Sequence, residues 1–152
     1  MKKILIVLLL TIATILPTVA SSWVKIDEWQ YIDKDSIKYY VNDYGRIDYQ
    51  KKIFWKKDTN IDDKYTIEIE RIFNKKVGYI INQDIIDFNK KQHACKSIIV
   101  YDENSNVITS FTYKDFQLDW RSIVPDSMGE KLYELVKSPK TLKKMYKMQT
   151  QY

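Results

Sequence analysis

The sequence predicts an α+β domain, in which a mainly antiparallel β-sheet of about five to six strands packs against a C-terminal α-helix. Short runs of aromatic and β-branched residues recur along a chain that contains 12 tyrosines, and such runs favour strands. Turn-forming clusters separate the runs, and Asn42-Asp43-Tyr44-Gly45 is the strongest hairpin signal among them. The clearest helix-start signals come only after Pro125.

Six runs are expected to form strands, over residues 23–26, 37–41, 46–57, 79–88, 95–101 and 107–113. Residues 33–36, 42–45 and 102–106 provide turns between them. The segment 65–74 is ambiguous, because Ile69, Ile72 and Phe73 have helical spacing while Ile67 and Ile69 also alternate. We expect a helix there.

Two further helices are expected near the C-terminus. Ser127 followed by Glu130 forms a capping box, which predicts a helix whose apolar stripe contains Leu132, Leu135 and Val136. Ser138-Pro139 starts a second helix, with proline in its first turn. Its lysines face outward in this prediction, so the helix either packs on the sheet, which we expect, or rests on anionic lipid.

The segment Arg46–Lys57 shows the clearest alternation in the chain. The pattern places Ile47, Tyr49, Ile53 and Trp55 on one face and Gln50, Lys52, Phe54 and Lys56 on the other. An outward row of Lys52, Phe54 and Lys56 would present an aromatic ring between two ammonium groups. These three are the candidate ligand-binding residues, suited to an acidic protein surface or a sulfated glycan. The alternative is an edge strand protected from aggregation by lysine.

Residues 1–20 have the pattern of a signal peptide, with cleavage after Ala20. Lys2 and Lys3 precede the apolar run Ile4–Leu16, which is shorter than the roughly 20 residues that a spanning helix needs. Ser21 follows the cut, where a lipid anchor would require cysteine. The sequence therefore predicts an exported chain with no transmembrane segment in the mature protein, divided into a domain over 21–137 and a basic helix or tail over 138–152.

The charge and composition of the chain favour a binding protein over an enzyme. The net charge of +5 falls to +3 when the segment containing Lys2 and Lys3 is removed, and both signs are mixed along the chain, so no nucleic-acid partner is expected. The chain has one histidine, His93, and one cysteine, Cys95, without the spacing of a catalytic pair or a metal site. We expect no enzyme activity, cofactor or metal; a hydrolase would require a deep pocket joining His93 to carboxylates.

Cys95 is expected to be a small, half-buried strand residue. The alternative is an intermolecular disulfide in an oxidising compartment.

The order of landmarks resembles the surface-adhesin protein E family of Gram-negative bacteria. The most specific blocks are Tyr31-Ile32-Asp33-Lys34-Asp35-Ser36-Ile37 and Trp120-Arg121-Ser122-Ile123-Val124-Pro125-Asp126-Ser127, and the resemblance extends from Trp23 to Lys137. It implies a small antiparallel sheet backed by a helix, and frequent dimerisation, so that a homodimer is a candidate assembly. It implies no catalysis.

Two departures from the family pattern stand out. The namesake member is lipid-anchored, whereas this chain lacks the required cysteine. Members also often carry a cysteine pair at the places where this chain has Phe88 and Lys137. A disulfide closing such a loop would contribute on the order of 4 kcal/mol, which this chain must recover by packing, with Phe88 as the expected core replacement.

The namesake member binds host cells and extracellular-matrix proteins, so the resemblance implies a surface binding module with a protein partner. The alternative is a periplasmic accessory or structural protein whose partner is another envelope component. The location is accordingly either the periplasm or the cell surface.

Overall fold

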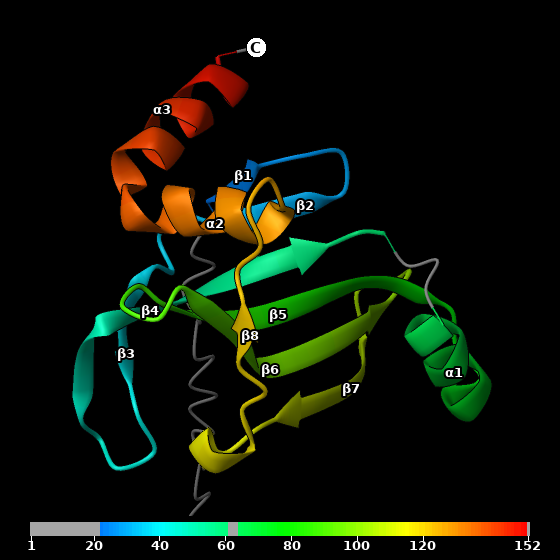
Figure 1. The fold of residues 1–152 in the computed structure, drawn as a ribbon. Helices are drawn as coiled ribbons and strands as arrows, with labels where there is room; N and C mark the ends of the chain where they lie inside the picture. The colour runs from blue at the N-terminus through cyan, green and yellow to red at the C-terminus, as the bar shows by residue number, and fades with distance from the viewer. Residues whose placement is uncertain (1–21, 61–63, 152) are drawn as a thin grey trace, which may run out of the picture.

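The computed structural model describes residues 22–60 and 64–151, so the predicted signal peptide lies outside the described residues. Within these ranges the chain forms an eight-stranded antiparallel sheet, three α-helices and one 3₁₀ turn (Figure 1). The α+β class and the C-terminal helix predicted from the sequence are confirmed.

The strands are β1 (Trp23–Lys25), β2 (Gln30–Asp33), β3 (Lys38–Val41), β4 (Ile47–Asp58), β5 (Val77–Asp87), β6 (Gln92–Asp102), β7 (Val107–Thr112) and β8 (Arg121–Ser122). The helices are α1 (Lys64–Phe73), α2 (Met128–Lys137) and α3 (Pro139–Gln149), and η1 (Asp115–Gln117) is the 3₁₀ turn. The main strand order is β1-β2-β4-β5-β6-β7, while β3 pairs with β4 and β8 with β6. The short strands β2 and β8 were not predicted as strands.

Strand β4 is longer than the sheet that supports it. Its pairing with β5 begins at Lys51, opposite Asp87, whereas its first residues pair only with β3. The β3–β4 hairpin therefore projects beyond the sheet, away from α1 and below the C-terminal helices in Figure 1. The predicted turn at its tip is confirmed, because the Gly45 amide donates to the Asn42 carbonyl at 2.9 Å and Gly45 has a φ of 76°.

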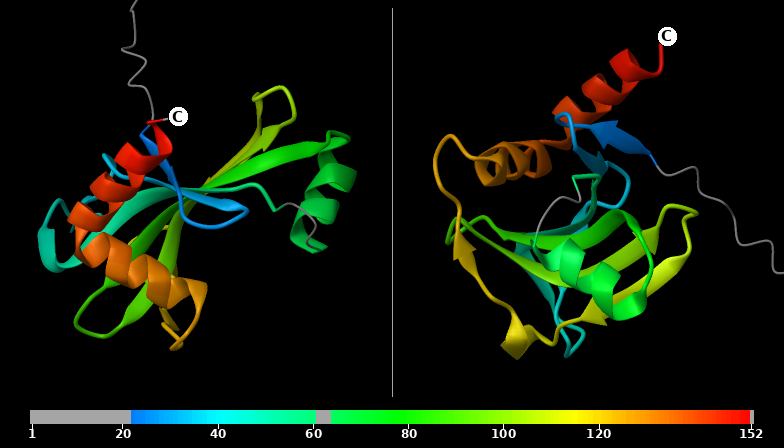
Figure 2. Two further views of the ribbon diagram at one scale, coloured as in Figure 1. Left: turned by 90° about the horizontal axis from the view of Figure 1, so that it is seen from above. Right: turned by 90° about the vertical axis from the view of Figure 1, so that its right-hand side faces the viewer.

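Both faces of the central strands are covered. On one face, α2 and α3 pack over the sheet (Figure 2), and the largest core cluster joins Ile32, Phe54 and Ile86 to Val136 and Leu142. On the other face, Leu118 and Trp120 pack against a cluster of Tyr40, Ile53 and Ile85. Burial on both faces removes the simple inside–outside alternation expected of a half-exposed sheet.

The helices begin where the sequence predicts. Ser127 caps α2, since its side chain accepts a hydrogen bond from the Glu130 amide. Leu142 of α3 is fully buried, so this basic helix packs into the core, and Gln149 exchanges hydrogen bonds with the backbone of Lys25. The ambiguous segment is a helix, and Ile69 of α1 packs in a smaller cluster with Val77, Ile80 and Val100.

Candidate functional site

The predicted outward row on β4 does not face solvent. Phe54 is only 1% exposed and belongs to the core beneath α2. The assignment of Phe54 to an outer face is therefore wrong, and the physical reason is that α2 and α3 pack over this side of β4. Any part that the three residues Lys52, Phe54 and Lys56 play in ligand binding stays a prediction.

The two lysines of that row have internal partners. The Lys52 ammonium donates to the Val136 carbonyl at 3.0 Å, near the C-terminal end of α2, where carbonyl groups lack helical partners. Burial lowers the pKa of Lys52. Lys56 lies 3.3 Å from the Asp84 carboxylate; burial alone would lower its pKa, but this carboxylate raises it. Neither ammonium group is displayed on an open surface.

A different group of side chains is exposed, on the projecting hairpin. We define the hairpin surface as Tyr39, Val41, Tyr44, Ile47 and Tyr49, whose exposed fractions run from 48% to 86%. Val41 pairs directly with Ile47, so these two share a face, and the rings of Tyr39 and Tyr49 meet edge to face at 5.3 Å. Apolar and aromatic groups gathered on one protruding element are typical of a protein-binding surface.

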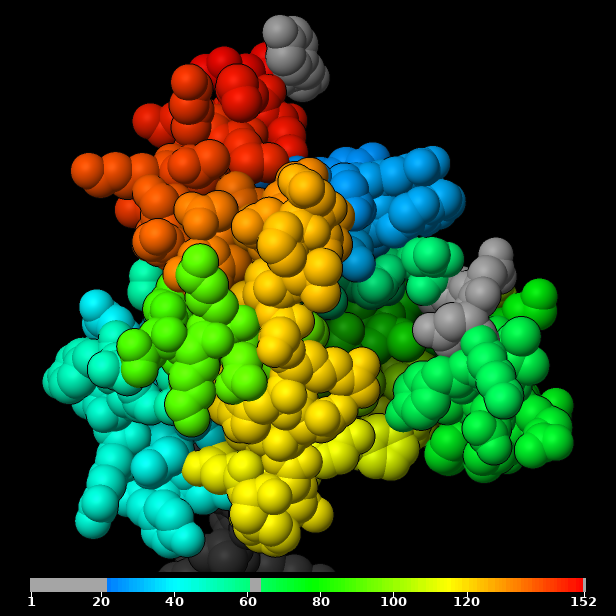
Figure 3. All heavy atoms as spheres, viewed as in Figure 1, coloured from blue at the N-terminus to red at the C-terminus, as the bar shows by residue number. Residues whose placement is uncertain are grey.

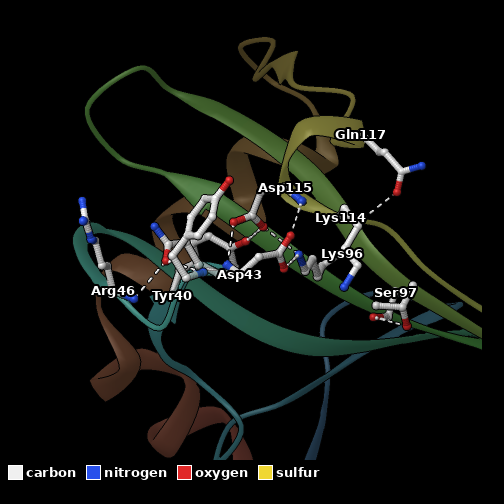
Figure 4. Close-up of polar contacts among 11 residues, drawn as sticks. Tyr40, Asp43, Arg46, Lys96, Ser97, Lys114, Asp115 and Gln117 are labelled. Atoms are coloured by element: carbon white, nitrogen blue, oxygen red, sulfur yellow. Dashed lines mark hydrogen bonds and ion pairs between the residues drawn. The ribbon is translucent and has the colours of Figure 1, made fainter.

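A polar cluster attaches this hairpin to the body of the domain. We define the Lys96 cluster as Tyr40, Asp43, Lys96 and Asp115, drawn in Figure 4. The Lys96 ammonium lies 2.8 Å from Asp43 and 2.6 Å from Asp115. The two aspartates also bond each other's backbone, since the Asp43 amide donates to Asp115 at 2.8 Å and the Asp115 amide to Asp43 at 2.7 Å. The Tyr40 hydroxyl donates to the Asp115 carboxylate.

The position of Lys96 depends on a β-bulge in β6. Asp84 pairs with Cys95 while the preceding Gln83 pairs with Ser97, which leaves Lys96 as the extra residue. A bulge redirects a side chain relative to the regular alternation. This one lets Lys96 bridge the hairpin tip and the η1 turn.

Charge and hydrogen bonding stabilise the ionised forms in this cluster. Burial would raise the pKa of Asp115, but hydrogen bonds from Lys96 and Tyr40 lower it below the ordinary value. Hydrogen bonds from Lys96 and the Asp115 backbone likewise lower the pKa of Asp43. Burial and the bond to Asp115 raise the pKa of Tyr40 to about 12. At neutral pH the cluster is therefore one cation between two anions, with a neutral phenol.

His93 and Cys95 both lie in β6, and the half-buried strand position predicted for Cys95 is confirmed. Within residues 22–60 and 64–151, no hydrogen bond joins His93 to Cys95 or to a carboxylate. Burial raises the pKa of the Cys95 thiol to about 12, which disfavours the nucleophilic thiolate. No group of three or more metal-ligating side chains occurs in the described part of the chain.

Sequence reasoning missed the hairpin surface and the Lys96 cluster for different reasons. Ile47 and Tyr49 were placed on an inward face, but no β5 residue lies beside them. A signal was present in the turn at Asn42–Gly45, which predicts a hairpin tip and hence exposure of its neighbours. The cluster joins Lys96 to Asp43 across 53 positions, and no local pattern reveals that contact.

Comparison with known proteins supports the fold. No protein-family model matches the sequence, and no curated protein matches it. Crystal form II of Haemophilus influenzae protein E matches with a TM-score of 0.50 and 14% identity, over 76% of this chain and 87% of that one. Protein E from non-typeable Haemophilus influenzae matches with a TM-score of 0.49 and 14% identity, over 85% and 90%.

Identity this low establishes a common fold and not a common ligand. No helix in the described ranges is long and apolar enough to cross a bilayer. In its fold the chain resembles Haemophilus influenzae protein E, which confirms at the level of the fold the resemblance to the surface-adhesin protein E family predicted from the sequence.

Proposed function

We propose that this chain is a non-enzymatic, exported binding module that recognises an extracellular-matrix or other host protein through the hairpin surface. The observation that carries the proposal is the concentration of exposed tyrosine and aliphatic side chains on one projecting hairpin. Tyrosine supplies a large contact area with few rotatable bonds and is enriched at interface hot spots. The similarity to protein E in fold supports a role in binding.

The attachment of the hairpin favours affinity. A mobile loop loses conformational freedom when it binds, whereas a hairpin held by Lys96, Asp43 and Asp115 has lost most of that freedom already. The edge-to-face contact of Tyr39 with Tyr49 also fixes two rings of the hairpin surface before any partner arrives.

The test is binding of the exported chain to a panel of purified matrix proteins, comparing the wild type with the double variant Tyr44→Ser/Tyr49→Ser. These side chains are 86% and 72% exposed, so the fold should tolerate the change while affinity drops by roughly tenfold or more. Ile67→Ser is the matched control, because Ile67 is 64% exposed on α1, at the far side of the sheet. Equal binding by the double variant and the control would contradict the proposal.

The second candidate is a periplasmic accessory or structural protein that binds another envelope component through the same surface. This candidate differs from the first in location, because its partner would lie on the periplasmic side of the outer membrane. Protease treatment of intact cells should degrade a surface protein and spare a periplasmic one. A homodimer also stays a prediction, and sedimentation of the purified chain at several concentrations tests it.

A further inference from the structure

The structure contains a cavity that the hairpin proposal does not use. It lies over the face of β4, β5 and β6, between these strands and the segment that leads from Tyr113 through β8 to the start of α2, and its volume is about 740 Å³. Figure 3 shows this face hollowed between the segment around residue 120 and α1. The volume falls within the range of about 300 to 1,000 Å³ that small-molecule sites occupy.

The strand register sets the polar floor of this cavity. Lys56 pairs with Asn82, and Asp84 pairs with Cys95, so four side chains from three strands point into the same space. Gln30 reaches it from β2. Apolar side chains, including Phe54, Ile98 and Leu132, complete the lining.

Several polar groups in this lining lack partners. The side chains of Asn82, His93 and Tyr113 make no hydrogen bond to any described residue. All three are half-buried, so their hydrogen bonds are left for water or for a ligand in the cavity.

The charges of the cavity are already balanced. Lys56 is paired with Asp84 at 3.3 Å, with side-chain exposures of 15% and 11%, and Arg121 at the rim is paired with Asp119 at 2.8 Å. Beside the sheltered Lys56–Asp84 pair, a charged ligand would leave its own charge or one of these two groups unpaired out of water, which is costly. A neutral ligand avoids that cost.

We propose that the cavity binds a neutral saccharide of one or two rings. Each hydroxyl of such a ligand both donates and accepts hydrogen bonds, which matches the unpaired side chains of Asn82, His93 and Tyr113 and the remaining ammonium protons of Lys56. The C–H faces of the sugar ring pack against the apolar part of the lining. The unpaired polar side chains of the lining distinguish this cavity from a binding site for a purely apolar ligand. The cavity shares no residue with the hairpin surface, so the two proposals fail or succeed separately.

The experiment is a titration of the isotopically labelled exported chain, followed by its amide NMR shifts, with glucose, galactose, N-acetylglucosamine, maltose and chitobiose. Sodium glucuronate and sodium decanoate are the charged comparators. We expect at least one neutral sugar to shift residues that line the cavity, and Asn82→Ala to weaken that binding roughly tenfold. Asn89→Ala, an exposed turn position outside the lining, should bind as the wild type does.

A second pair of variants guards against misfolding at Asn82. Tyr113→Phe removes only a hydroxyl from the lining and should weaken binding, whereas Tyr44→Phe on the hairpin should not. The proposal is overturned if no neutral sugar binds, if only glucuronate or decanoate does, or if the sugar shifts lie outside the cavity. It is also overturned if Asn82→Ala and Tyr113→Phe both retain wild-type affinity.

Discussion

The ring of Phe88 lies 5.1 Å from the ring of Tyr133, so a residue at the end of β5 packs directly against α2. Within α2, the Lys137 ammonium lies 5.4 Å from the centroid of the Tyr133 ring. The family resemblance places a cysteine pair at Phe88 and Lys137. In this chain the ring contact between Phe88 and Tyr133 joins the same two segments.

Replacing Phe88 with alanine should lower the free energy of unfolding by roughly 2 to 3 kcal/mol, because the change empties a partly buried position beside Tyr133. Urea unfolding of residues 21–152 measures this. Phe116→Ala is the control: Phe116 is 86% exposed, and its loss should change stability by less than about 0.5 kcal/mol. Equal losses in the two variants would show that Phe88 does not substitute for a covalent link.

Replacing Lys96 with methionine should release the hairpin. The change leaves the carboxylates of Asp43 and Asp115 facing each other without their shared cation, although the backbone of the sheet is unaltered. Hydrogen exchange should become faster at the amides of residues 40–48 and stay unchanged in α2. Lys144→Met, at an exposed position of α3, is the control and should alter exchange in neither region. If the hairpin amides of Lys96→Met exchange as slowly as those of the wild type, the hairpin is not attached through this cluster.

Stability should fall in acid, in a way that depends on Asp115. Its pKa is lowered in the folded chain below the ordinary 3.8, so its contribution is complete above that value and is lost as the pH falls through the folded pKa. Between about pH 5 and about pH 3, Asp115→Asn should therefore lose less stability than the wild type. Urea unfolding at both pH values checks this, with a substitution of the exposed Asp119, Asp119→Asn, as the control. Equal losses of unfolding free energy in the wild type and in Asp115→Asn would contradict the prediction.

Gly78→Ala should destabilise the join between β5 and β6. A β-carbon at this position would lie 2.6 Å from the carbonyl oxygen of Asp102, which belongs to the backbone of the neighbouring strand and cannot rotate away. We expect a loss of roughly 1 to 3 kcal/mol in thermal or urea unfolding. Ser110→Ala, on the exposed strand β7, is the comparison, and a Gly78→Ala variant as stable as Ser110→Ala would refute the close approach.

Local signals in the sequence predicted local structure well. The helix cap at Ser127 and the turn at Asn42–Gly45 both depend on contacts within a few residues, and both are confirmed. The second bond of a capping box differs from the prediction, since the Glu130 carboxylate accepts from the Asp126 amide and not from Ser127. The helix over residues 65–74 is confirmed for the same reason.

The faces of β4 could not be predicted from alternation alone. Phe54 and Ile53 are adjacent, point to opposite sides, and are both buried, because helices cover one side and the segment with Leu118 and Trp120 covers the other. Ile47 and Tyr49 are exposed because β4 extends beyond the end of its neighbour β5. The exposure of each β4 residue therefore depends on which segments pack over the strand, and those segments are distant in sequence.

The most direct test of the central claim is a hydrogen-exchange footprint of residues 21–152, measured alone and with the matrix protein that binds most tightly in the panel. Binding through the hairpin surface should slow exchange at residues 39–49 and leave α1 and α3 unchanged. Slowed exchange confined to α1 or α3, or the absence of any matrix protein that binds, would contradict the claim that this sheet domain recognises its partner through the β3–β4 hairpin.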